Sequence, residues 1–171
     1  MKELLKAQYE LIRITRETMF AFLGELPLEK LRADVPGFGS GSILRTHIHV
    51  ADCYRYWLGS FAFGQKRADF AFAAKEDIAR ADVRAVRDRF KRADEAVDRF
   101  LDEYDGRMLE RVTNEVKWQP EWSTTPLWLL THTETHEFHH KGQIAAMARL
   151  LGYEPPNTDL ERAGTVPTGG R

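Results

Sequence analysis

The histidines of this chain are concentrated in one short stretch near its C-terminal end. Four of the six histidines lie between Thr131 and Gln143, in a segment whose pattern predicts a helix. His136 and His140 are four residues apart, so a helix places both imidazoles on one face, one turn of ~5.4 Å apart. From there they can converge on one ion at the ~2.0–2.1 Å of a metal–nitrogen bond. The pair indicates a metal site, although two buried histidines held by hydrogen bonds would have the same spacing.

The other two histidines, His47 and His49, lie far upstream in a second predicted helix. Because they are two positions apart, they point ~200° apart around the helix, and only one of them can face the pair. The helical period slightly favours His47 as the histidine that faces the pair. His49 lies on the same face of its helix as polar residues such as Asp52, which suits a pocket that solvent can reach. Two ligands from one helix and one from another make a three-histidine site with an open position, as in catalytic metal centres.

The two remaining histidines of the C-terminal stretch are not predicted to bind the ion. His132 lies one turn before His136, but eight helical residues, or ~12 Å, separate it from His140. We expect His132 to line one edge of the pocket. His139 points ~100° away from its neighbour His140, which favours a hydrogen-bonding or surface role.

Other polar residues near the histidines each have a functional and a structural interpretation. Asp52 can orient a ligand or form an exposed salt bridge, and Gln143 can contact the open position or pack at the helix end. Cys53 is predicted to be a small buried hydrophobe, and Glu134 and Glu137 to be solvated helix charges. As the single cysteine, Cys53 allows no internal disulfide, and a thiolate metal site within one chain is not expected.

Composition restricts the class of protein. The 171 residues amount to one domain, 43% of them are hydrophobic and 30% charged, and the net charge is −1. No basic patch for nucleic acid is apparent, and no run approaches the ~18 apolar residues of a membrane span. The N-terminal residues also lack the apolar core of a signal peptide. We therefore expect a cytoplasmic protein with no nucleic-acid or membrane partner.

Hydrophobic periodicity predicts an all-α protein. Apolar residues recur every three or four positions through four segments, and only Arg16 interrupts the register of the first. Breakers such as Pro27, Gly64 and Gly106 end the segments. We expect an up-and-down-type four-helix bundle. Its predicted helices are residues 3–26, 42–63, 82–106 and 126–151.

The connecting segments are predicted to be mostly irregular. Residues 27–41 and 64–78 read as loops, and a short hairpin is predicted within 107–123. The domain is expected to span residues 1–160. Residues 161–171 are expected to form a flexible C-terminal tail.

Two stretches resemble a known family. Residues 135–144, together with residues 151–159, resemble the closing helix of the DinB-like family. Residues 49–58 resemble the same family, which places a histidine eight positions before a tryptophan. The resemblance implies a four-helix bundle, often a homodimer, that binds zinc or nickel through three histidines.

Transferred residue by residue, the resemblance implies His49, His136 and His140 as the ligands, and so selects His49 over His47. Relatives include thiol-dependent transferases and isomerases and metal-dependent hydrolases. The first hypothesis is therefore an enzyme of the transferase or hydrolase type that acts on a small molecule, with a low-molecular-weight thiol as a candidate cofactor. The alternative is a non-catalytic metal- or ligand-binding stress-response protein. A bundle with purely structural histidines is the third hypothesis.

Overall fold

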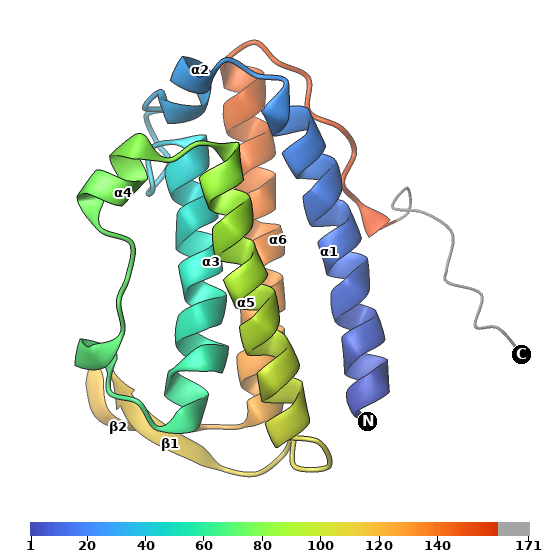
Figure 1. Ribbon diagram of the computed structural model, residues 1–171, viewed down its shortest axis with the longest axis vertical. Helices are drawn as coiled ribbons and strands as arrows, with labels where there is room; N and C mark the ends of the chain where they lie inside the picture. Colours follow the sequence, from blue (N-terminus) through green and yellow to red (C-terminus); the bar gives the residue numbers. More distant parts are fainter. Residues whose placement is uncertain (161–171) are drawn as a thin grey trace, which may run out of the picture.

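Four long helices lie side by side along the long axis of the molecule (Figure 1). The computed structural model describes residues 1–160, and the predicted tail, 161–171, lies outside the described residues. The predicted all-α bundle is confirmed, with helix bounds close to those expected from periodicity. The long helices are α1 (Lys2–Gly24), α3 (Ile43–Gly59), α5 (Val83–Glu103) and α6 (Pro126–Leu150).

Side-chain caps explain where three of these helices begin. Ser42, Asp82 and Thr125 each accept a hydrogen bond from the backbone N–H three residues further on. Such a cap satisfies one of the N–H groups that has no partner inside the helix. Pro126 at the first helical position reinforces the start of α6, since its fixed φ suits a helix and it has no N–H to satisfy.

The connectivity differs from the predicted up-and-down order. Helices α3 and α5 run in the same direction, and residues 64–82 run back along the outside of α3 to join them (Figure 1). A hydrogen bond between their C-terminal ends is consistent with this direction. The hydroxyl of Tyr104, just after α5, donates to the carbonyl of Ala62, just after α3, at 2.5 Å. Parallel neighbours require such a long crossover. The prediction was wrong because periodicity defines helices and carries no information on their direction.

Short elements fill the connections. The loops predicted at 27–41 and 64–78 contain short helices, and the predicted hairpin is present and antiparallel, with Val112 opposite Thr124. In Figure 1 the hairpin crosses one end of the bundle. The short elements are α2 (Leu28–Arg32), η1 (Phe61–Phe63), η2 (Arg67–Asp69), α4 (Lys75–Arg80), β1 (Val112–Val116) and β2 (Gln119–Thr124).

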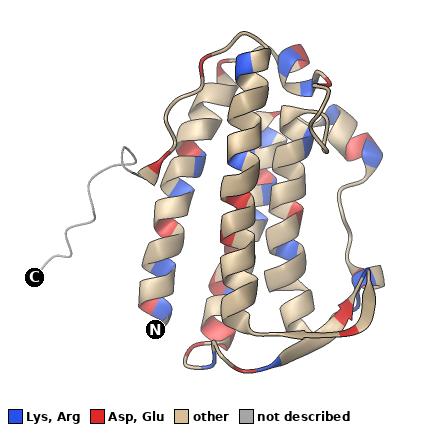
Figure 2. Cartoon of the chain, turned by 180° about the vertical axis from the view of Figure 1, so that it is seen from behind, with Lys and Arg blue, Asp and Glu red and all other residues tan. Residues whose placement is uncertain are grey.

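The core lies where α3 packs against α5 and α6, with α1 against α5. Helix α3 is buried on nearly all sides, as its apolar circumference predicts, and Tyr54 and Leu58 are fully buried. Figure 2 shows basic and acidic residues interspersed along the helices. None of the helices described here has the length and apolar character needed to cross a lipid bilayer.

Helices α1 and α6 are joined by a buried ion pair. Arg16, which interrupts the apolar register of α1, is only 2% exposed. Its guanidinium donates to both carboxylate oxygens of Glu137, at 2.8 and 2.9 Å, and to Asp94 on α5 at 2.7 Å. Glu137 and Glu134 are both buried, so the prediction that they are solvated charges was wrong. The reason is that each has a polar partner on α1: Arg16 for Glu137, and Gln8 for Glu134 at 2.7 Å.

Candidate metal centre

Three of the predicted histidines meet between α3 and α6. One ring nitrogen from each of His49, His136 and His140 lies within 4.8 Å of the others. The Nε2 atoms of His49 and His136 are 3.0 Å apart. The ring centroid of His140 lies 4.9 Å from that of His49 and 4.3 Å from that of His136. His49 is exposed and the other two are half-buried, so the group is open to solvent on one side.

His47 lies on the other side of α3, as the spacing of two residues requires. It is 4% exposed, and its ring packs against Phe20 and Phe90 with centroids 5.2 and 6.1 Å apart. The helical period slightly favoured His47 as the residue facing His136 and His140, but in the structure His47 faces the apolar core. The more apolar stripe of α3 faces the dry core, and the more polar stripe carries His49 to the α6 pair.

All three imidazoles of the group are held in the neutral form. Burial lowers the pKa of His49 and His140, and it lowers the pKa of His136 to about 3, with the neighbouring histidines adding to the effect. A neutral imidazole has one nitrogen with a free lone pair, which is the form that binds a cation. The lowered pKa values therefore favour the form in which all three imidazoles can bind a cation.

Gln143 holds the ring of His140. Its side-chain carbonyl Oε1 lies 2.7 Å from His140 Nδ1, and its Nε2 lies 3.1 Å from His139 Nε2. Since the carbonyl oxygen can only accept, Nδ1 of His140 carries the hydrogen and Nε2 is left as the free lone pair. This is the usual arrangement by which a neighbour orients a metal-binding histidine. His139 has the predicted hydrogen-bonding role, while Gln143 acts through His140.

The group has dimensions that fit a metal ion. In a tetrahedral site with bonds of ~2.0–2.1 Å, neighbouring ligand nitrogens are ~3.3 Å apart. His49 and His136 are at 3.0 Å, and all three ligand atoms lie within 4.8 Å. A donor set made only of imidazoles suits zinc, nickel or related transition metals better than calcium or magnesium, which prefer oxygen.

A second group with the spacing of metal ligands shares His136 and adds Cys53 and His132. A thiolate site was not expected in a chain with one cysteine, and a mixed group of one cysteine with two histidines was not considered. Cys53 is 8% exposed, as predicted for a small buried side chain, and burial raises the pKa of its thiol to about 12. Because a neutral thiol is a poor ligand, the three-histidine group is the better metal site.

An aromatic surface borders the centre. His132 stacks on Trp128, with centroids 4.8 Å apart and planes at 10°, and meets the edge of Trp57 at 5.5 Å. Trp128, His132, His136 and His140 are each four residues apart and so form one stripe along α6. His132 thus lies at the edge of the centre, as predicted. The same spacing would have identified Trp128 from the sequence.

Asp52 forms its hydrogen bonds with groups other than the described histidines. It is 4% exposed, and its Oδ1 accepts hydrogen bonds from Arg55 at 3.0 Å and Arg89 at 2.8 Å. Its Oδ2 accepts from the backbone N–H of Ala73 at 2.8 Å. Neither predicted role, orienting a ligand or forming an exposed salt bridge, is present. Asp52 instead ties the 64–82 crossover and α5 to α3.

Comparison with known proteins places this chain in a protein family. The model of a family described as the DinB family matches residues 1–166. The matched region includes all four long helices and the three histidines of the centre. A search of curated proteins found no match to the chain.

Proposed function

Because the chain belongs to the DinB family, we propose that it is a metalloenzyme in which His49, His136 and His140 bind one divalent cation, zinc or nickel. The convergence of three neutral imidazoles on one solvent-reachable point supports this proposal most directly. When bound, the cation would supply a Lewis acid with an open position, at which water or a thiol is activated. The reaction would be a transfer to a low-molecular-weight thiol or a hydrolysis.

The chain's own residues would orient the ligands and the substrate. Gln143 keeps the hydrogen of His140 on Nδ1, so the Nε2 lone pair points into the centre. Trp128, 43% exposed, and the stacked His132 offer a flat aromatic surface beside His136. A small substrate with a flat or apolar body would pack on this surface and place its polar group at the open position.

Elemental analysis of the purified protein tests the ligands. We expect about one divalent metal ion per chain, as a single three-ligand site requires. His140→Ala should abolish the metal content, and His139→Ala, on the neighbouring exposed position, should retain it. Cys53→Ser should also retain the metal. Full retention by His140→Ala, or loss in Cys53→Ser, would show that the ion is not held by the three histidines.

A second assay tests catalysis. The metal-loaded protein is incubated with bacterial low-molecular-weight thiols and an electrophile, and conjugates are measured by mass spectrometry. Hydrolysis of small esters and amides is measured in parallel. Product should form only with the metal-loaded protein and should disappear after chelation. A protein that retains its metal and forms no product in either assay would favour the non-catalytic metal-binding alternative.

A further inference from the structure

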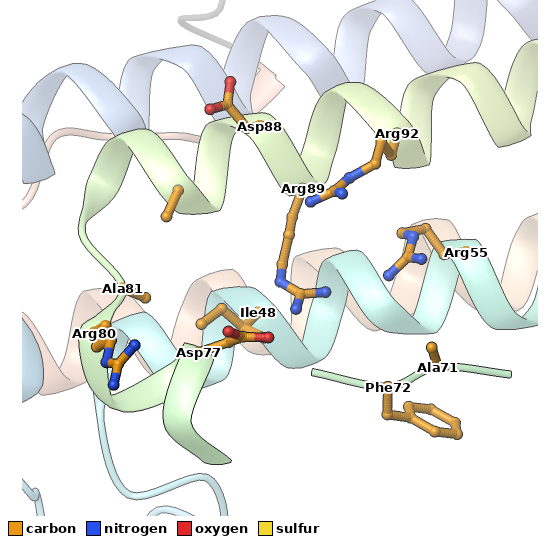
Figure 3. Close-up of a pocket in the computed structure, with 11 residues that line it drawn as sticks. Ile48, Arg55, Ala71, Phe72, Asp77, Arg80, Ala81, Asp88, Arg89 and Arg92 are labelled. Atoms are coloured by element: carbon orange, nitrogen blue, oxygen red, sulfur yellow. The ribbon is translucent and has the colours of Figure 1, made fainter. Parts of the chain in front are cut away.

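A separate cavity of about 580 Å³ lies between α3, α4 and α5, and its lining is rich in arginine. Figure 3 shows Arg55 on α3 facing Arg89 and Arg92 on α5, with Arg80 entering from α4. The crossover of residues 64–82 closes the outer side through Ala71 and Phe72. The histidines of the metal centre do not line this cavity.

A second cavity of about 460 Å³ adjoins the first. Arg55 and Arg92 line both, and Arg99 on α5 is added in the second. The two cavities are neighbours along α3 and α5, and we call them together the arginine groove. Its five arginines are Arg55, Arg80, Arg89, Arg92 and Arg99.

Positive charge in the arginine groove is only partly balanced. Asp52 is a single carboxylate shared between Arg55 and Arg89. Asp88 lines the groove but pairs with Lys91 at 2.8 Å. Asp77 and Glu95 are the other lining carboxylates, and within residues 1–160 neither forms an ion pair. Five arginines thus meet four carboxylates, one of which pairs with Lys91, and the small positive excess favours an anionic ligand.

The arginines also have unused hydrogen-bond donors. A guanidinium carries five N–H donors, and Arg55 and Arg89 each use only Nη1 in contacting Asp52. The side chains of Arg80 and Arg92 form no ion pair within the described part of the chain. Arg55 and Arg89 are 22% and 14% exposed, so hydrogen bonds from them to an anion would be formed away from bulk water. Paired N–H groups match the oxygens of a phosphate.

Apolar side chains also line the groove. Ile48 and Phe72 line the first cavity beside the arginines, and the volume lies within the ~300–1,000 Å³ typical of small-molecule sites. We propose that the arginine groove binds a small phosphate monoester, whose phosphate lies between Arg55, Arg89 and Arg92 and whose apolar body packs on Ile48 and Phe72. The fork of guanidinium N–H groups favours a phosphate, with its three free oxygens, over a carboxylate. This site is separate from the metal centre.

Titration calorimetry of the metal-loaded protein at constant ionic strength tests this site, with phenyl phosphate, inorganic phosphate and benzoate as ligands. Phenyl phosphate should bind more tightly than either of the others. Arg92→Ala should weaken its binding about tenfold, the effect of losing one charge-assisted contact. Arg92 is exposed, so this variant should fold normally.

Arg84→Ala is the matched control, since Arg84 is an exposed arginine on α5 outside the groove. It should bind phenyl phosphate as the unchanged protein does. An equal loss in Arg84→Ala, equal binding of benzoate, or no measurable binding would overturn the proposal. Binding that persists in Arg92→Ala and disappears in His140→Ala would place the phosphate on the metal ion and would likewise overturn it. Because the phosphate site does not require the metal, the proposed function and this proposal can fail independently.

Discussion

Replacing Glu137 by leucine tests the buried ion pair between α1 and α6. The two side chains are 2% and 5% exposed for Arg16 and Glu137, and two hydrogen bonds of 2.8 and 2.9 Å join them. Without the carboxylate, the guanidinium keeps Asp94 at 2.7 Å as its remaining ionic partner. Removing one partner of a buried pair costs ~3–5 kcal/mol, because the other charge stays buried. Since Asp94 persists, we expect the free energy of unfolding to fall by ~3–4 kcal/mol.

The second variant, Arg16→Met with Glu137→Leu, separates an unpaired charge from lost packing. If the unpaired guanidinium causes the loss, removing it should recover ~1–3 kcal/mol relative to the single variant. Arg13→Met is the control, because Arg13 is half-exposed and its pairs with Glu10 and Asp94 should be worth at most ~1 kcal/mol.

Urea denaturation followed by circular dichroism measures these free energies. Metal content is measured on the same samples, since Glu137 directly follows His136. A loss below ~1 kcal/mol in Glu137→Leu, or a double variant less stable than the single one, would refute the interpretation that Arg16 depends on Glu137.

Four further outcomes are expected. Chelation should lower the melting temperature, because a metal that binds only the folded chain stabilises it by mass action, and the helical signal should remain; outright unfolding would identify a structural metal. His49→Ala should lose most of the metal, whereas His47→Ala should retain it and cost ~1–3 kcal/mol, and the reverse would contradict the register of α3. Burial lowers the pKa of His47 to about 3, below the ~6.5 of an unfolded chain, so its contribution to stability is complete above pH 6.5 and is lost as the pH falls towards 3. Denaturation at several pH values should show a shallower acid loss for His47→Phe. Asp52→Ala should cost ~2–4 kcal/mol, because Arg55, Arg89 and the N–H of Ala73 all lose their acceptor; a cost below ~1 kcal/mol would contradict its role in tying the crossover to α3.

Features that depend on one helix could be predicted from the sequence. The spacing of His136 and His140 places them on one face whatever surrounds α6. Helix ends follow local signals less closely: Gly106, with a φ of 75°, comes three residues after the end of α5, whereas α3 already ends at Gly59 and Gly64, also with a φ of 75°, caps η1. The choice between His47 and His49 was harder, because it depends on how α3 is rotated against α5 and α6.

Features that depend on distant partners were missed. Arg16 and Glu137 are 121 residues apart, so neither the interrupted register at Arg16 nor the position of Glu137 on its own helix indicates the partner. Asp52 was likewise misassigned, because two of its three partners lie 21 and 37 residues away, in the crossover and on α5. The arginine groove exists only because the crossover returns along α3. The spacing of apolar residues within a helix does not indicate that the segment after it runs back along its outer side.

The three-histidine group also sets an order of events during protein synthesis. His49 and His136 are 87 residues apart, and α6 is the last long helix to be made. At ~5–20 residues per second, a ribosome takes about 4–17 s to proceed from one histidine to the other. Throughout that interval the growing chain contains only one of the three imidazoles, that of His49 on α3, and neither of the two histidines from α6. An ion can therefore be captured by all three only after α6 has emerged and docked, so the metal would be acquired by a finished bundle and could not guide its earlier folding.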